Sequence, residues 1–114
     1  MAMIVENERA QVAPAAAMFR SLGDPGRLAI VRRLAEGEAR VVDLTASLGL
    51  AQSTVSKHLA CLRDCGLVDF RPDGRQSFYF LTVSPLAELL FAAERVLEAT
   101  GYAVMLCPTY GSVQ

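Results

Sequence analysis

Residues 41–68 contain two stretches of helical apolar spacing separated by a glycine. In the first stretch, Leu44 and Leu48 lie four residues apart, so both fall on one face of a short helix. This helix is expected to end in a tight turn at residues 48–50, because Gly49 readily adopts the positive φ that a change of direction requires. The first stretch therefore predicts a helix followed by an abrupt turn.

A second helix is expected after the turn, from about Gln52 to Cys65. Val55, Leu59 and Leu62 recur at intervals of three and four residues and form one narrow apolar stripe. Two short helices joined by a tight turn form the helix-turn-helix unit, whose second helix enters the major groove of DNA. We predict such a unit over residues 41–66.

The segment after the second helix has the pattern of a β-hairpin. Residues 67–71 and 76–81 have strand character, and Pro72-Asp73-Gly74 between them is a turn signal. Two strands are marginal by themselves, so the hairpin has to pack on the helices. The predicted fold class is mainly α with a small β-hairpin (α+β): a winged helix-turn-helix with its wing over residues 67–82.

Another helix is expected ahead of the helix-turn-helix. Asp24 is a good N-cap, and Pro25 after it suits the first helical position. The helix is expected to end near Gly37. Its predicted inward-facing residues are Leu28, Ile30, Val31 and Leu34.

Two outer helices, at about residues 8–21 and 85–106, carry broad apolar faces. Together with the tail at residues 107–114, they complete a predicted single domain over residues 1–114. The hydrophobic fraction of 53% is high for a chain of 114 residues, which has little interior. We therefore expect some of this apolar surface to contact a second copy of the chain.

The exposed face of the second helix of the helix-turn-helix is rich in short hydrogen-bonding groups. Such groups suit base edges and phosphates, and a merely solvated face more commonly shows Glu, Lys and Ala. The candidate contacts to double-stranded operator DNA on this helix are Gln52, Ser53, Thr54, Ser56, Lys57 and His58. Those beside the hairpin turn are Arg71, Arg75 and Gln76.

Each of these candidates also has a simpler interpretation. Ser53 suits a helix N-cap, Lys57 and His58 suit an ordinary surface pair, and the wing residues suit a solvated turn. The net charge of −1 does not by itself indicate nucleic acid. Residues 20–75 are more basic, with nine Lys and Arg against seven Asp and Glu.

Three cysteines are the candidate ligands for a metal ion. Cys61 and Cys65 lie four residues apart, so their side chains share one helix face, and Cys107 is the third thiol. Three thiolates favour a soft, thiophilic cation over Mg²⁺, Ca²⁺ or Mn²⁺. Zinc prefers a fourth ligand.

The same cysteines leave two alternatives open. Each thiol is also a small hydrophobe that packs well in a core. Oxidation is a second possible signal, which would make the chain a thiol redox-responsive repressor. A disulfide between Cys61 and Cys65 is awkward on one helix, so that scheme requires Cys107.

Other functional classes fit the sequence poorly. No apolar run approaches the roughly 18 to 20 residues that span a bilayer, and the first residues do not resemble a signal peptide, so a cytoplasmic protein without membrane contacts is expected. We find no nucleophile elbow, phosphate loop or paired carboxylates, which argues against an enzyme and a small organic substrate. A winged-helix module that binds only protein is a further alternative, but it predicts an apolar or acidic face on the second helix.

The run from Leu22 to Leu81 resembles the ArsR/SmtB family of bacterial metal-responsive repressors. The residues that carry the resemblance are Leu22-Gly23-Asp24-Pro25 with Arg27, Ser53-Thr54-Val55-Ser56-Lys57-His58-Leu59, Gly66-Leu67-Val68, and Gly74-Arg75 before Phe78-Tyr79. The resemblance implies a homodimer that is built from the first and last helices, binds an imperfect palindrome and releases it when an inducer binds.

Residues 58–66 are similar to the cadmium- and lead-sensing CmtR branch of that family. The resemblance implies that Cys61 and Cys65 hold the ion together with a C-terminal cysteine of the other subunit, a position that Cys107 matches only loosely. The expected inducer is Cd²⁺ or Pb²⁺, with Zn²⁺ or As(III) as alternatives.

Overall fold

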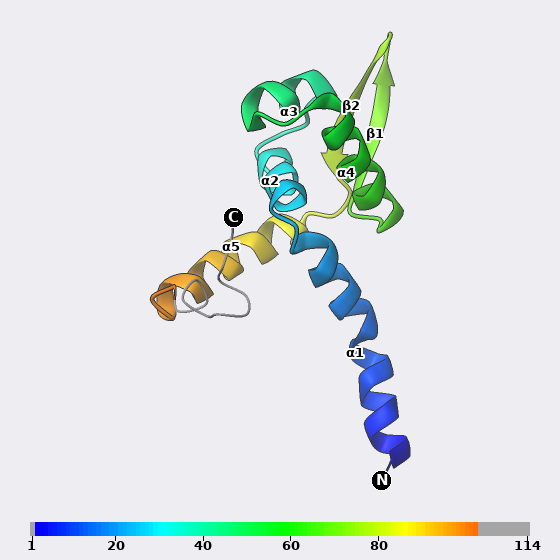
Figure 1. Ribbon diagram of the computed structural model, residues 1–114, viewed down its shortest axis with the longest axis vertical. Helices are drawn as coiled ribbons and strands as arrows, with labels where there is room; N and C mark the ends of the chain where they lie inside the picture. The colour runs from blue at the N-terminus through cyan, green and yellow to red at the C-terminus, as the bar shows by residue number, and fades with distance from the viewer. Residues whose placement is uncertain (1, 103–114) are drawn as a thin grey trace. The chain divides into compact units, whose positions relative to one another are not determined.

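The computed structural model describes residues 2–102, with side chains from residue 7 onward. The chain divides into two compact units, residues 1–82 and 83–114. The described elements of the first unit, in chain order, are α1 (Ala2–Leu22), α2 (Pro25–Leu34), α3 (Val41–Leu48), α4 (Gln52–Asp64), β1 (Val68–Asp73) and β2 (Gln76–Leu81) (Figure 1). The described helix of the second unit is α5 (Pro85–Ala99).

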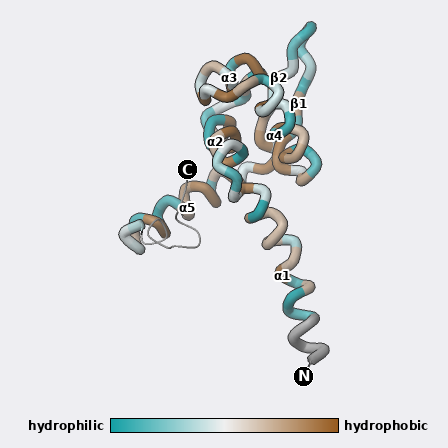
Figure 2. Tube along the Cα trace, in the orientation of Figure 1, coloured by the Kyte–Doolittle hydropathy of each residue, from teal (hydrophilic) through white to brown (hydrophobic). Residues whose placement is uncertain are grey.

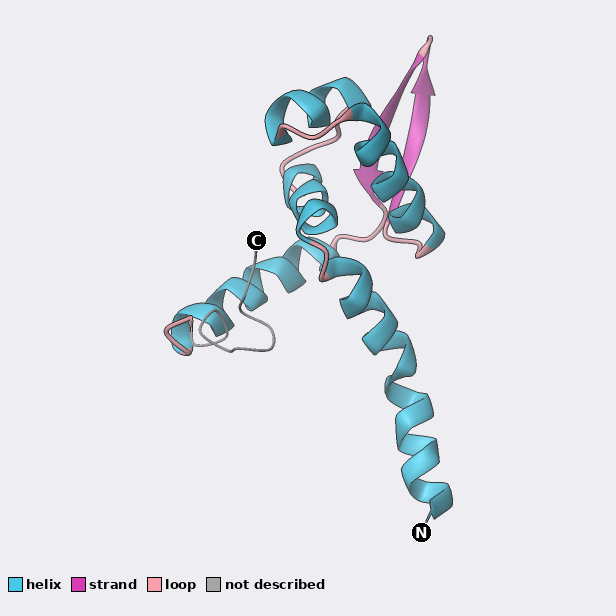
Figure 3. Ribbon diagram, in the orientation of Figure 1, coloured by secondary structure: helices cyan, strands magenta, loops and turns pink. Residues whose placement is uncertain are grey.

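The helix-turn-helix is formed by α3 and α4, which pack against each other and against α2 (Figure 3). Gly49 caps α3 in the left-handed conformation, with φ 67° and ψ 27°, and its N–H donates to the carbonyl of Thr45 at 3.0 Å. The apolar stripe of Val55, Leu59 and Leu62 on α4 is fully buried. The predicted helix, glycine turn and second helix are therefore confirmed.

The predicted hairpin is also present, as two antiparallel strands that pair from Val68 with Leu81 to Asp73 with Gln76. Its first strand is longer than expected, because Pro72 lies inside β1 opposite Ser77 and does not begin the turn. A proline is tolerated in an edge strand where no N–H is needed for the ladder. The turn is consequently reduced to Gly74 and Arg75, with glycine at the first central position.

A single antiparallel bridge joins the hairpin to the residues that lead into α3. The N–H of Ala39 donates to the carbonyl of Tyr79 at 3.0 Å, and the N–H of Tyr79 donates to the carbonyl of Ala39 at 2.8 Å. The backbone N–H and C=O groups of Ala39 and Tyr79 therefore hydrogen-bond to each other. This pair of bonds connects the wing directly to the segment that leads into the helix-turn-helix.

The core of the first unit lies between α2, α3, α4 and the start of β1. Its largest fully buried side chains are Ile30, Val31, Leu44, Val55, Leu59, Leu62 and Val68. Figure 2 shows apolar and hydrophilic stretches alternating along these helices, as expected for elements with one buried face. The prediction was wrong for Leu28, which is 39% exposed, although Ile30, Val31 and Leu34 on the same helix are buried.

The helices outside the helix-turn-helix differ from prediction in their bounds. α1 begins at Ala2 instead of near residue 8 and continues through Pro14, and α2 ends at Leu34, three residues before Gly37. α5 ends at Ala99 and not near residue 106, because Gly101 turns the chain at φ 63° and its N–H donates to the carbonyl of Glu98.

Both α1 and α5 present large apolar side chains to the surface. Val12 and Phe19 on α1 are 60% and 55% exposed, and Phe91 and Val96 on α5 are 70% and 60% exposed. Over residues 2–102, no helix is both long enough and apolar enough to cross a membrane. The exposed apolar residues of α1, and those of α5, are each a surface that a partner molecule can cover.

Candidate DNA-binding face and cysteine pair

The solvent-facing side of α4 carries most of the polar residues predicted to contact DNA. Gln52, Ser53, Ser56 and Lys57 are exposed, and Thr54 is half-buried. The N-cap of α4 is Ala51, which makes no side-chain capping hydrogen bond, so Ser53 does not act as the cap. Its hydroxyl lies on an exposed helix face, where it can donate or accept a hydrogen bond to an external partner.

His58 differs from the other candidates because its ring faces the N-terminal end of α2. Its Nε2 lies 3.5 Å from Oδ2 of Asp24, and its side chain is only 19% exposed. Asp24 is the N-cap of α2, where it accepts a hydrogen bond from the backbone N–H of Arg27 at 3.0 Å. That N–H lowers the pKa of Asp24, and the nearby His58 lowers it further. Within the described part of the chain, His58 is therefore a link between α4 and α2.

The two described cysteines lie at the C-terminal end of α4 and are free thiols. Cys61 is half-buried, and Cys65, the C-cap, is exposed. Sγ of Cys65 donates a hydrogen bond to Oγ of Ser21 at 3.6 Å, which connects the pair to the end of α1. Ser21 is itself buried.

Cys107, the third predicted ligand, lies outside the described residues. Among the side chains of residues 7–102, no three His, Cys, Asp or Glu are placed to hold a metal ion. Cys61 and Cys65 nevertheless fit the chemistry of a thiophilic cation, because both are sulfur donors one helical turn apart and neither is fully buried. The described structure thus supplies two thiol donors.

The two wing arginines, Arg71 and Arg75, differ in whether an acidic residue of the described chain already pairs with them. The Arg71 guanidinium pairs with Glu38, which lowers the pKa of that carboxyl, and it stacks on the ring of Phe78 at 4.8 Å. Arg75 lies at the hairpin turn, is exposed and forms no ion pair with any residue of the described chain. Of these two arginines, Arg75 is therefore the one whose charge is free for an external anion.

The sequence prediction missed Arg40, whose side chain contacts the predicted site residue Gln76. Oε1 of Gln76 accepts a hydrogen bond from Nη1 of Arg40 at 2.9 Å, although the two residues are 36 positions apart. The Arg40 guanidinium also pairs with Asp43, with Nη2 and Oδ1 at 2.8 Å. No local pattern marks Arg40, because its role depends on the wing folding back beside α3.

A helix-turn-helix with an exposed polar second helix, followed by an antiparallel hairpin, makes this chain a winged helix-turn-helix protein. Its face on α4 is polar, not the apolar or acidic face that a module binding only protein predicts. Comparison with known proteins identifies the family.

Residues 24–69 match the family model of bacterial regulatory proteins of the arsR family. The chain is 37% identical over 94 residues to the probable mercury resistance operon repressor of Streptomyces lividans, covering 82% of this chain and 74% of the relative. It is 47% identical over 84 residues to the HTH-type transcriptional regulator CmtR of Mycobacterium tuberculosis, covering 74% and 71% of the two chains. The chain belongs to the arsR family of bacterial regulatory proteins.

Two solved structures place the fold in the same group. The NMR structure of the cadmium metal-sensor CmtR from Mycobacterium tuberculosis matches with a TM-score of 0.60 at 45% identity, covering 68% of this chain and 80% of that one. A homodimeric winged helix-turn-helix DNA-binding domain from Mycobacterium bovis matches with a TM-score of 0.72 at 27% identity, covering 80% and 84%. The predicted fold class and family resemblance are therefore confirmed.

Proposed function

We propose that this chain is a cytoplasmic transcriptional repressor that binds operator DNA as a homodimer and releases it when a thiophilic metal ion binds. The exposed polar face of α4 enters the major groove, and the wing contacts the flanking backbone. The proposal assigns no catalytic role to any residue. The observation that carries the metal-sensing part is the pair of incompletely buried thiols, Cys61 and Cys65, on the DNA-contacting helix itself.

The dimer is proposed to form through α1 and α5 within a single domain of residues 1–114. Support comes from the exposed Val12, Phe19, Phe91 and Val96, which a lone chain leaves in water. A relative from Mycobacterium bovis with the same fold is described as homodimeric. Two-fold symmetry places two copies of α4 at a fixed spacing, which matches a palindromic operator.

The DNA contacts in this proposal differ in what they do. Gln52, Ser53, Thr54 and Ser56 present hydrogen-bonding groups to base edges, and Lys57 supplies a charge for phosphate. Arg71, Arg75 and Gln76 act from the wing, where Arg75 has the free charge. His58, which was also predicted as a contact, holds α4 against α2 through Asp24 and thereby orients the helix.

The inducer is proposed to be Cd²⁺ or Pb²⁺, held by Cys61, Cys65 and Cys107. A relative with 47% identity is CmtR, whose NMR structure is described as that of a cadmium metal-sensor, and another relative is a probable mercury resistance repressor. A bound cation would join the thiolates into one ligand set. Zn²⁺ and As(III) remain alternative inducers.

The coupling follows from where the thiols lie. Cys61 and Cys65 belong to the end of α4, and Cys65 touches Ser21 at the end of α1. If the Cys107 of the ligand set belongs to the partner subunit, the bound ion would tie α4 to that subunit and change the spacing of the two DNA-contacting helices. About 3 kcal/mol of coupling lowers DNA affinity roughly 150-fold, which is enough for a switch.

The test is a titration of reduced protein with Cd²⁺, in which the ultraviolet sulfur-to-metal charge-transfer band and the binding of a labelled duplex from its own promoter region are both recorded. We expect saturation at one ion per subunit and loss of DNA binding at the same point. Mg²⁺, which prefers oxygen ligands, is the control ion and should change neither signal.

Cysteine variants separate the ligands from the alternatives. Cys61→Ser, Cys65→Ser and Cys107→Ser should each retain DNA binding and lose release by Cd²⁺. A charge-transfer band without any change in DNA affinity would contradict metal sensing. Release by the thiol oxidant diamide in the absence of metal, abolished in Cys107→Ser, would instead support the redox-responsive alternative.

A further inference from the structure

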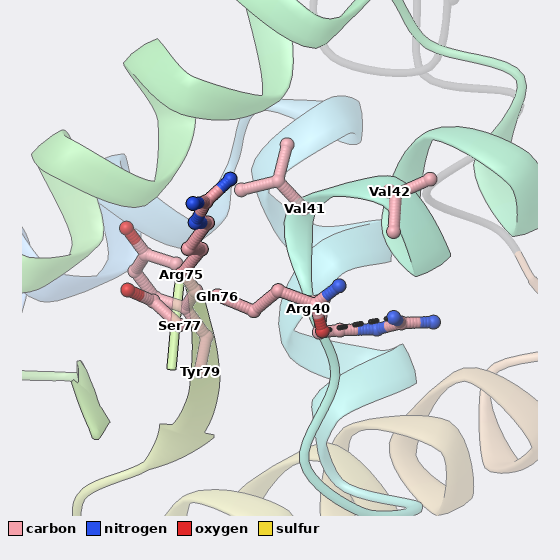
Figure 4. A pocket seen from close by; sticks show the side chains of 7 residues that line it. All are labelled: Arg40, Val41, Val42, Arg75, Gln76, Ser77 and Tyr79. Atoms are coloured by element: carbon pink, nitrogen blue, oxygen red, sulfur yellow. Dashed lines mark hydrogen bonds between the residues drawn. The ribbon is translucent and has the colours of Figure 1, made fainter. Parts of the chain in front are cut away.

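A surface hollow of about 380 Å³ lies between the start of α3 and the second strand of the wing. Figure 4 shows Arg40, Val41 and Val42 on the side of α3, facing Arg75, Gln76 and Ser77 from the wing. A smaller hollow of about 130 Å³ shares Val41 and Val42 with it and extends to Gln52, the first residue of α4. The two hollows together run from the DNA-contacting helix to the wing.

The polar groups around the larger hollow are suited to an anion. The guanidinium groups of Arg40 and Arg75 are its two charged side chains, and Ser77 and Gln76 contribute a hydroxyl and an amide. Val41 and Val42 are the first two residues of α3, whose backbone N–H groups have no partner within the helix. The positive end of the α3 dipole adds to the same charge.

Arg40 is held in place before any ligand arrives. Its guanidinium pairs with Asp43 at 2.8 Å, and the dashed line in Figure 4 marks its hydrogen bond to Gln76 at 2.9 Å. It also lies 5.9 Å from the centre of the Phe78 ring. The side-chain hydrogen bond from Arg40 lowers the pKa of Asp43 to about 2, so at neutral pH the Asp43 carboxylate offsets the Arg40 charge. Arg75 and the N-terminus of α3 therefore supply the net positive charge, and Arg40 supplies positioned N–H donors.

We propose that this hollow binds a phosphodiester group of the DNA backbone, with Arg40, Arg75 and the first N–H groups of α3 as donors. The inference rests on the proposed DNA binding and adds Arg40, Ser77 and the start of α3 to its contacts. DNA is favoured over free phosphate because the hollow continues to Gln52 on α4. The sugar-phosphate backbone of a duplex bound along α4 would therefore lie next to the hollow. The contact is independent of base sequence.

The salt dependence of DNA binding tests the contact, because each neutralised phosphate contributes about 0.9 to the slope of log affinity against log salt. Arg40→Gln and Arg75→Gln should each lower this slope by about 0.9 and weaken binding to the promoter duplex and to unrelated duplexes alike. Over a fourfold rise in salt, the wild type should lose about 3.5-fold more affinity than either variant.

Arg32→Gln is the matched control. Arg32 is an exposed arginine on α2 that does not line either hollow, so this variant removes the same charge elsewhere in the first unit. Its salt slope should equal that of the wild type. Arg40→Lys keeps the charge and should keep the slope, which separates the loss of a phosphate contact from damage to the Arg40–Asp43 pair. Circular dichroism confirms that each variant is folded.

NMR distinguishes the two sources of phosphate. Backbone amide signals of Val41 and Val42 should shift when the promoter duplex is added, and millimolar inorganic phosphate alone should shift them little. Equal shifts with inorganic phosphate and no slope change in Arg40→Gln would overturn the proposal in favour of a free-anion site. If wild-type protein binds no duplex, the proposed function itself fails. If wild type binds and Arg40→Gln behaves as Arg32→Gln, only this inference fails.

Discussion

The Asp24 carboxylate connects α2 and α4, and replacing it gives a quantitative test of the structure. It caps α2 by accepting the N–H of Arg27 at 3.0 Å, and it lies 3.5 Å from Nε2 of His58 on α4. Asp24→Ala removes both interactions. Asp24→Asn keeps an oxygen that can cap the helix and removes only the charge.

The expected magnitudes separate the two contributions. Loss of an N-cap costs about 1 kcal/mol, within a range of roughly 0.5 to 2 kcal/mol. The contact with His58 is partly exposed to solvent, so it contributes at most about 1 kcal/mol and is weakened by salt. We therefore expect Asp24→Ala to lower the free energy of unfolding by about 1.5 kcal/mol, and Asp24→Asn by about 0.5 kcal/mol or less.

Urea unfolding at a fixed protein concentration measures both variants, since dimer formation makes stability depend on concentration. With an m-value of about 2 kcal/mol/M, Asp24→Ala should move the midpoint down by roughly 0.7 M. The Asp24 pKa is lowered in the folded state, so its stabilisation is present above pH ~4 and is lost as pH falls through the folded-state pKa. The difference between wild type and Asp24→Asn should shrink accordingly.

The result that would refute this reasoning is an equal loss of stability in Asp24→Ala and Asp24→Asn. Capping would then not be the stabilising interaction, and the charge beside His58 would have to account for the whole effect. The variant pair Asp24→Asn and His58→Gln, made singly and together, measures the coupling between the two side chains directly. We expect a coupling below about 1 kcal/mol.

Two further predictions concern the turn at Gly49 and the Arg40–Asp43 pair at the start of α3. Gly49→Ala should lower the free energy of unfolding, measured with urea, by about 1 to 2 kcal/mol. A Cβ at this position would contact no other atom, so the loss comes from forcing alanine into the backbone conformation with φ 67°. Gly49→Asn should recover part of that loss, and equal losses for the two would contradict a backbone cause. Arg40→Gln should return the pKa of Asp43 from about 2 toward 3.8 in a carboxyl NMR titration. In the wild type, the stabilisation from this pair is present above pH ~4 and lost as pH falls toward 2, and an unshifted titration would show that Arg40 does not hold Asp43.

The parts of the fold that the sequence predicts well are those decided by neighbours in the chain. Gly49 marks the turn because few other residues adopt its φ, and Val55, Leu59 and Leu62 mark the buried side of α4 because helical spacing determines which side chains share a face. Helix ends are predicted less well. α5 stops at Ala99 because a glycine cap at Gly101 outweighs the apolar pattern that continues beyond it.

The site contacts that escape prediction join residues distant in sequence. His58 falls beside an exposed face by spacing alone, and only the position of α2 turns its ring toward Asp24. Arg40 lines the hollow between α3 and the wing because the wing carries Gln76 to it. Nothing in the local sequence encodes either partnership. The placement of Cys61 and Cys65 one turn apart was predictable because their four-residue spacing is itself a local pattern, and their binding of a metal ion stays a prediction.

The bridge between Ala39 and Tyr79 has a consequence for redesign. Its two backbone hydrogen bonds use no side-chain atoms, so the distance between the wing and the helix-turn-helix does not depend on which residues α4 exposes. Under the proposed function, substitutions at Gln52, Ser53 and Ser56 change which bases are preferred without changing the frame that presents them. The same frame, with the same wing geometry, can therefore present different sets of α4 residues to different operator sequences.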